Sequence, residues 1–85
     1  MSASRSDERK VGSAAIMASE RRVKRDIELL GREPDSLGVY RFNYIWDEPG
    51  ETPRYGVMAD EVEQLRPWAL GPVMNGIQTV NYGAL

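Results

Sequence analysis

The chemistry open to this chain is limited by two residue types that it lacks. Its 85 residues include no cysteine and no histidine, which excludes disulfides, thiolate metal sites and the usual general base. Any catalysis must therefore use Ser, Lys, Asp, Glu, Tyr or Arg. A serine hydroxyl needs a base to become nucleophilic, and a lysine amine serves as that base when burial or nearby cations lower its pKa.

Serine and lysine lie close together in the sequence at Ser19 and Lys24, and also at Ser6 and Lys10. Arginines flank Lys24, and their charges would lower its pKa if they crowd the amine. Residues five apart lie about 140° apart on a helix and on opposite faces of a strand. Ser19 and Lys24 can therefore meet only across a turn or between chains. The purely structural interpretation makes Ser19 a helix cap and Lys24 part of a solvated basic face.

Two charged clusters also suggest binding sites. The acidic side chains at positions 60, 61 and 63 suggest a cation site, but helix capping and a solvated face explain them better. The basic run Arg21 to Arg25 suggests nucleic acid, but it is short and has no interleaved aromatic residues. We therefore expect no metal, no other cofactor and no nucleic-acid partner.

The size of the chain favours assembly with other chains. A domain of this length buries only about 60% of its unfolded surface, and without disulfide or metal the common remaining support is oligomerisation. The net charge is −2, divided between +3 in residues 1–32 and −5 in residues 33–85. This division suits packing between chains and a solvated surface equally well. No apolar run approaches the ~18 residues of a membrane span, and the polar start is not a signal peptide, so we expect a soluble protein.

The middle of the chain predicts a β-hairpin. Residues 39–46 are rich in aromatic and β-branched residues, residues 47–50 have turn chemistry, and residues 54–58 form the return strand. One face of the first strand would carry an aromatic stripe of Tyr40, Phe42, Tyr44 and Trp46. We expect this stripe to be core, so that Trp46→Ala costs about 3–5 kcal/mol.

A short helix and a second hairpin should follow. Asp60 is the expected N-cap, with Glu63 at capping-box spacing, and Pro67 ends the helix. Asn75-Gly76 lies between two apolar runs within residues 71–82, which is a strong hairpin signal. The predicted fold class is α+β, a small single domain with two β-hairpins, one short helix and a mobile basic N-terminal segment.

Four segments, in order, resemble the endosialidase-type intramolecular chaperone domain, the self-cleaving C-terminal chaperone of phage tail spikes and fibres. Residues 19–27, beginning Ser-Glu-Arg-Arg-Val-Lys, are similar to the opening of that domain, and residues 40–46 to its aromatic strand. Gly-Val-Met-Ala-Asp-Glu-Val at 56–62 resembles its most recognisable segment, and Val-Asn-Tyr at 80–82 its ending. Asp60 stands where the family usually has Gln. The resemblance divides the chain into an N-terminal segment, 1–18, flexible or partner-bound, and a chaperone-like domain, 19–85.

The resemblance implies both a site and a role. It makes Ser19 the nucleophile and Lys24 its base, with Ala18–Ser19 as the scissile bond. It implies an assembly or structural module associated with a phage tail fibre or spike, as a homotrimer or in complex with a fibre protein. Its location would be the virion or the host cytoplasm during assembly.

Self-cleavage is left open at this point, because two features depart from the family pattern. Only eighteen residues precede Ser19, and the chain stops where relatives continue into a long helix. The alternatives are a non-proteolytic virion structural protein and a free-standing interaction module.

Overall fold

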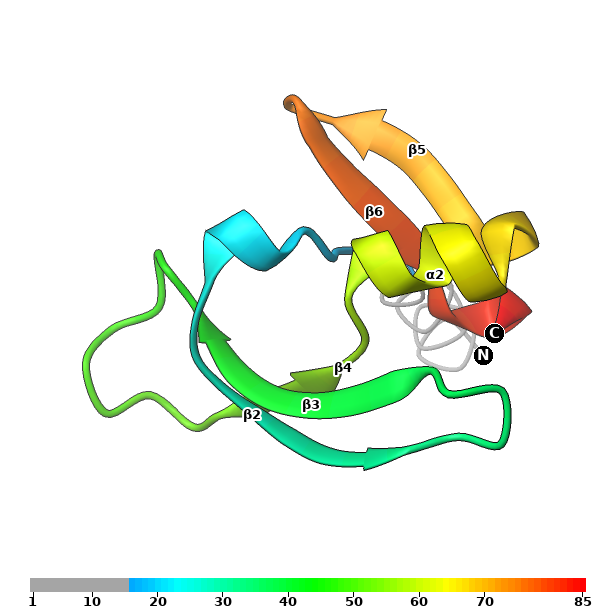
Figure 1. Cartoon of the computed structure of the whole chain (residues 1–85). Coiled ribbons are helices and arrows are strands. Elements are labelled where there is room, and N and C mark those ends of the chain that lie inside the picture. Colours follow the sequence, from blue (N-terminus) through cyan, green and yellow to red (C-terminus); the bar gives the residue numbers. More distant parts are fainter. Residues whose placement is uncertain (1–15) are drawn as a thin grey trace, which may run out of the picture.

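Two three-stranded antiparallel sheets and one α-helix make up the part of the chain that the computed structural model describes, residues 16–85 (Figure 1). The predicted α+β class is confirmed. The elements in chain order are β1 (Ile16–Ala18), the 3₁₀ turn η1 (Arg21–Val23), β2 (Lys24–Arg32), β3 (Gly38–Tyr44), β4 (Arg54–Gly56), α2 (Ala59–Leu65), η2 (Pro67–Ala69), β5 (Leu70–Met74), β6 (Ile77–Asn81) and η3 (Tyr82–Ala84).

The first sheet has the strand order β2-β3-β4 and contains the predicted central hairpin. In β3 the alternating aromatic residues point into the core and Arg41 points to solvent, as a half-buried strand requires. The sequence had indicated only an apolar cluster before this hairpin. That cluster lies on β2, a nine-residue strand that pairs antiparallel with β3 and forms the edge of the sheet.

The second sheet has the order β1-β6-β5 and contains the predicted Asn-Gly hairpin. Asn75 and Gly76 both have positive φ, 53° and 76°, as a two-residue turn of this kind demands. The three residues before Ser19 form β1, which pairs antiparallel with β6. The other residues of the predicted N-terminal segment, 1–15, lie outside the described part of the chain.

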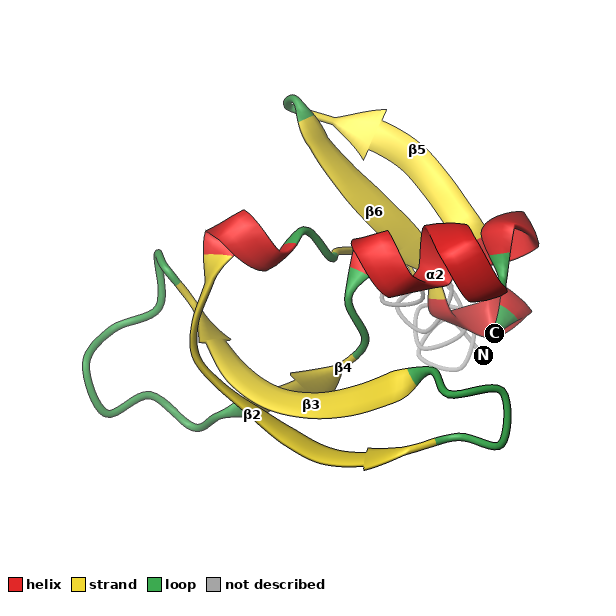
Figure 2. Ribbon diagram, viewed as in Figure 1, coloured by secondary structure: helices red, strands yellow, loops and turns green. Residues whose placement is uncertain are grey.

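The helix α2 crosses between the two sheets (Figure 2). It begins at Ala59, two residues earlier than an N-cap at Asp60 would allow, and Met58 takes the N-cap position without a side-chain cap bond. The prediction of Asp60 as N-cap is therefore wrong. Met58 is fully buried, and this anchors the start of the helix before Asp60. The helix ends at Leu65, ahead of Pro67, as predicted.

The core consists of two clusters that meet at residues 57–59. One cluster, around Leu37, Val62 and Val80, packs α2 against the second sheet. The other, around Phe42 and Met58, covers the inner face of the first sheet. Among residues 16–85, no helix is long and apolar enough to cross a membrane.

Trp46 does not belong to the core, which corrects one expectation. Tyr40, Phe42 and Tyr44 are buried, but Trp46 is 54% exposed. The strand β3 ends at Tyr44, where the Asp47 N–H donates to the Tyr44 carbonyl at 3.0 Å and closes a turn. The alternation of a strand therefore stops before it reaches Trp46, whose ring stacks on Tyr44 from outside at a centroid distance of 4.6 Å.

Candidate functional site

The 3₁₀ turn η1 brings Ser19 and Lys24 together within one chain. It reverses the backbone between β1 and β2, so that the Lys24 Nζ lies 3.3 Å from the Ser19 carbonyl oxygen. The Val23 N–H donates to the Glu20 carbonyl at 3.3 Å and closes this turn. The two residues therefore meet across a turn of one chain, which is one of the two arrangements that their five-residue spacing allows; the other is a contact between chains.

Lys24 is a buried amine. Its side chain donates to the Val57 carbonyl at 2.8 Å and lies 3.7 Å from the Met58 sulfur, with the Phe42 ring centroid 4.3 Å from Nζ. Burial, followed by the charge of Arg21, lowers the pKa of Lys24 from 10.5 to about 8. The interpretation of Lys24 as part of a solvated basic face is therefore excluded, since the residue is only 6% exposed.

Ser19 is completely buried, and each of its polar groups has a partner. Its hydroxyl donates to the Met17 carbonyl at 3.0 Å, and its N–H donates to the Gln78 carbonyl at 3.0 Å. Its own carbonyl accepts from the Ala59 N–H at 2.8 Å. Glu20, and not Ser19, is the N-cap residue of η1, so the helix-cap interpretation of Ser19 is also excluded.

Hydrogen bonds and strand pairing fix the residues on both sides of the Ala18–Ser19 peptide bond. On the amino side, β1 pairs with β6 and places Ala18 opposite Thr79. The Ala18 carbonyl oxygen accepts a hydrogen bond from the Tyr44 hydroxyl at 2.7 Å. Burial raises the pKa of Tyr44 to about 12, so this hydroxyl keeps its proton over the whole neutral range.

The segment Gly56–Ala59 forms one wall of the site, which explains a motif that the sequence singled out only by resemblance. The Val57 carbonyl and Met58 sulfur contact the Lys24 amine, and the Ala59 N–H contacts Ser19. Gly56 leaves the space that this wall needs, because a Cβ atom there would clash with the Tyr82 hydroxyl oxygen. That hydroxyl accepts from the Val57 N–H at 2.9 Å and so fixes this wall.

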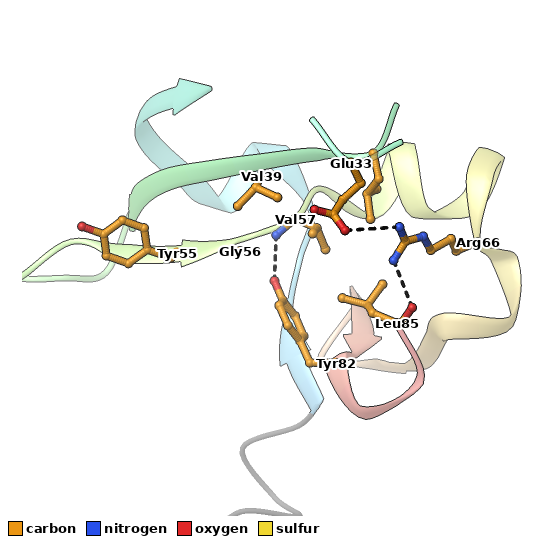
Figure 3. Close-up of a pocket in the computed structure, with 9 residues that line it drawn as sticks. Glu33, Val39, Tyr55, Gly56, Val57, Arg66, Tyr82 and Leu85 are labelled. Atoms are coloured by element: carbon orange, nitrogen blue, oxygen red, sulfur yellow. Dashed lines mark hydrogen bonds and ion pairs between the residues drawn. The ribbon is translucent and has the colours of Figure 1, made fainter. Parts of the chain in front are cut away.

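A pocket of about 480 Å³ lies beside this wall (Figure 3). The Tyr82 ring lines it, and the hydrogen bond from Val57 to the Tyr82 hydroxyl runs along its edge. At the other side Arg66 pairs with Glu33 at 3.8 Å and donates to the Leu85 carbonyl at 3.0 Å. The pocket adjoins the Ser19 site, but neither Ser19 nor Lys24 lines it.

The acidic residues at the start of α2 are engaged by basic and polar groups of the same chain. Asp60 and Glu61 both bind Arg21, with N–O distances of 3.2 and 3.3 Å. Glu61 also accepts from the Gly38 N–H at 2.8 Å and from the Tyr40 hydroxyl. These carboxylates therefore tie α2 to the first sheet and to η1.

The chemistry that this arrangement permits is acyl transfer at the Ala18 carbonyl. It contains a buried hydroxyl, a buried amine whose pKa is lowered to about 8, and the Ala18–Ser19 peptide bond, whose carbonyl oxygen accepts from Tyr44. Sequence reasoning placed Tyr44 in the core and gave Tyr82 no contact in the site. The register of the first sheet, which pairs Lys24 with Tyr44, is the structural feature that joins Tyr44 to the pair.

Comparison with known proteins gives one family match. The family model described as chaperone of endosialidase matches residues 19–70, which begin at Ser19 and include Lys24, Tyr44 and the wall 56–59. No curated protein and no solved structure matches the chain. The match covers more than half of the sequence, and the chain belongs to the family of endosialidase chaperones.

Proposed function

We propose that this chain is an assembly module of a phage tail fibre or spike that cleaves itself between Ala18 and Ser19. The observation that carries the proposal is the burial of Ser19 and Lys24 side by side, with the Lys24 Nζ 3.3 Å from the Ser19 carbonyl oxygen. A buried lysine with no functional use is costly, because its charge must be desolvated. Family membership supports the assembly role.

The proposed cleavage uses residues that adjoin in the chain. Neutral Lys24 takes the proton of the Ser19 hydroxyl, and the Ser19 Oγ attacks the carbonyl carbon of Ala18. The C–N bond to the Ser19 nitrogen then breaks, and protonated Lys24 returns the proton to that nitrogen. The product is an ester between Ala18 and the Ser19 Oγ. Water hydrolyses it, leaving a carboxylate on Ala18 and a free amine and hydroxyl on Ser19.

One side-chain movement must precede this attack. The Ser19 hydroxyl now donates to the Met17 carbonyl, and it must exchange that acceptor for the Lys24 amine. The amine is already within 3.3 Å of a backbone atom of the same residue. The proposed attack therefore begins with a rotation about the Ser19 side-chain bond that turns the hydroxyl away from Met17.

Exposed apolar side chains on β2 support the proposed assembly as a homotrimer or with a fibre protein. Ile27, Leu29 and Leu30 are 36%, 47% and 48% exposed on a strand at the edge of its sheet. Apolar residues left exposed on an edge strand can be covered when that strand packs against another chain. On this proposal the protein acts in the virion tail or fibre, after assembly in the host cytoplasm.

Mass spectrometry of a chain with an N-terminal tag tests the proposal. We expect the unmodified chain to yield a fragment ending at Ala18 and a second fragment beginning at Ser19. Ser19→Ala and Lys24→Ala should each abolish the cleavage, and Lys24→Arg should not restore it, because a guanidinium does not release its proton near neutral pH. Ser6→Ala is the matched control and should cleave normally.

The same experiment separates the alternatives. An intact mass after prolonged incubation would refute self-cleavage and favour a non-proteolytic virion structural protein. Co-purification of that intact chain with phage particles or with a fibre protein would then distinguish such a protein from a free-standing interaction module.

A further inference from the structure

We propose that Tyr44 is a third catalytic residue, whose hydroxyl stabilises the oxyanion that forms on the Ala18 carbonyl oxygen during self-cleavage. This inference rests on the proposed cleavage before Ser19. It adds a residue that the Ser19 and Lys24 pair does not require, and its evidence is independent of that pair.

The position of the Tyr44 hydroxyl carries the inference. It donates to the Ala18 carbonyl oxygen at 2.7 Å, within the range of donors that stabilise an oxyanion. When Ser19 attacks, the negative charge develops on this oxygen. A hydrogen bond to an ionised acceptor is about twice as strong as one to a neutral acceptor, so the contact gains strength in the transition state.

The first sheet holds this hydroxyl rigidly. Tyr44 lies opposite Lys24 in the register of β2 and β3, so one pair of facing positions supplies both the base and the oxyanion donor. The Tyr44 ring packs edge-on against Phe42 at 5.3 Å and is stacked under Trp46. A donor fixed in advance does not have to reorganise when the charge forms.

The titration of Tyr44 is consistent with this role. Its pKa is raised to about 12 by burial, whereas that of Lys24 is about 8. Between these values the lysine is largely neutral and the tyrosine still carries its proton. Base and donor are therefore in their active states together.

The test is the cleavage rate of Tyr44→Phe in the full-length chain, followed by mass spectrometry during cell-free synthesis. The substitution keeps the buried ring and removes only the hydroxyl. We expect cleavage to slow by about a hundredfold, the loss typical for one oxyanion donor. Tyr40→Phe is the matched control, since this buried tyrosine of the same strand donates to Glu61 and not to Ala18, and it should cleave at the normal rate.

Two further measurements separate a catalytic role from a structural one. In the uncleavable Ser19→Ala chain, Tyr44→Phe should leave the thermal unfolding temperature close to that of Tyr40→Phe. It should also shift the carbonyl ¹³C resonance of Ala18, which reports the lost hydrogen bond. Equal cleavage rates in Tyr44→Phe and the unmodified chain would overturn the inference alone. An unmodified chain that never cleaves would overturn the proposed function, and this inference with it.

Discussion

The lowered pKa of Lys24 comes from burial more than from its arginine neighbours. Three arginines lie within three residues of it, yet Arg21 is the arginine whose charge contributes to the lowered pKa, after desolvation. Arg22 is turned towards Glu20, and Arg25 towards Asp26. The contacts with Val57 and the Phe42 ring stabilise the ammonium form. The pKa of about 8 therefore reflects mainly desolvation, then the charge of Arg21, with the charge of Asp60 acting in the opposite direction.

The pH dependence of cleavage follows from this residue. The base must be neutral, and a pKa lowered to about 8 means that the neutral fraction of Lys24 rises as pH rises towards that value. We expect the cleavage rate to increase about tenfold between pH 6 and pH 7 and to level off above about pH 9. Timed mass spectrometry in matched buffers measures it. A rate independent of pH over this range, with the chain still folded by circular dichroism, would exclude Lys24 as the base.

The family resemblance allowed Ser19 and Lys24 to be identified as a pair from the sequence. The geometry of the pair could not be predicted in this way. A five-residue spacing is compatible with a contact across a turn and with a contact between chains. The turn η1 is what brings the two residues together within one chain. The contact of Tyr44 with Ala18 could not be predicted either. An aromatic residue in an alternating strand is assigned to the core, and its hydroxyl contact with Ala18 depends on where β1, a strand of the other sheet, places that carbonyl.

At the scale of elements, the end of β3 is set by the side chain of Asp47. This buried carboxylate accepts from the Tyr44 N–H at 2.9 Å and binds Arg54 through two hydrogen bonds of 3.0 Å. These bonds hold the pKa of Asp47 well below its usual range. The turn 44–47 is therefore fixed, and it separates the buried aromatic residues of β3 from the exposed Trp46.

A pair of substitutions checks this boundary. Trp46→Ala should cost about 1 kcal/mol or less, because the exposed ring loses mainly its stacking on Tyr44. Phe42→Ala, at a position 2% exposed, should cost about 3–5 kcal/mol. Denaturant unfolding of both variants in the Ser19→Ala chain compares them directly. Equal costs would mean that Trp46 is buried in solution.

Elements with strong local signals could be predicted from the sequence, and those defined by partners could not. The Asn75-Gly76 turn and the stop at Pro67 depend on backbone preferences of the residues themselves. The strand β2 has no clean alternation, because bulges interrupt its pairing with β3 and Asp26 has a positive φ of 54°. The short strand β1 becomes a strand only through β6.

At the scale of the whole molecule, the site lies where the two sheets meet. The second sheet holds β1, the first supplies Lys24 and Tyr44, and the segment 56–59 links them (Figure 1). Cleavage after Ala18 would separate β1 from the first residue of the matched domain. The strand β1 would then be held by non-covalent contacts alone, its pairing with β6 and the hydrogen bond from Tyr44 to Ala18 among them. Release of the upstream segment therefore requires both the chemical step and the loss of this pairing.

The exposed apolar residues of β2 give a prediction about assembly. Edge strands are usually protected by charges or bulges, and β2 has bulges but leaves Leu29 and Leu30 about half exposed. We expect the Ser19→Ala chain to form a homotrimer of about 29 kDa, three times the 9.6 kDa of one chain, in multi-angle light scattering at micromolar concentration. Leu29→Lys with Leu30→Lys should shift it to monomer, because two buried charges would each be costly to desolvate. Gln64→Lys, which adds a charge at an exposed position of α2, is the control and should remain trimeric. A thermally stable monomer in the Ser19→Ala chain would rule out the trimer and leave β2 free for a fibre protein.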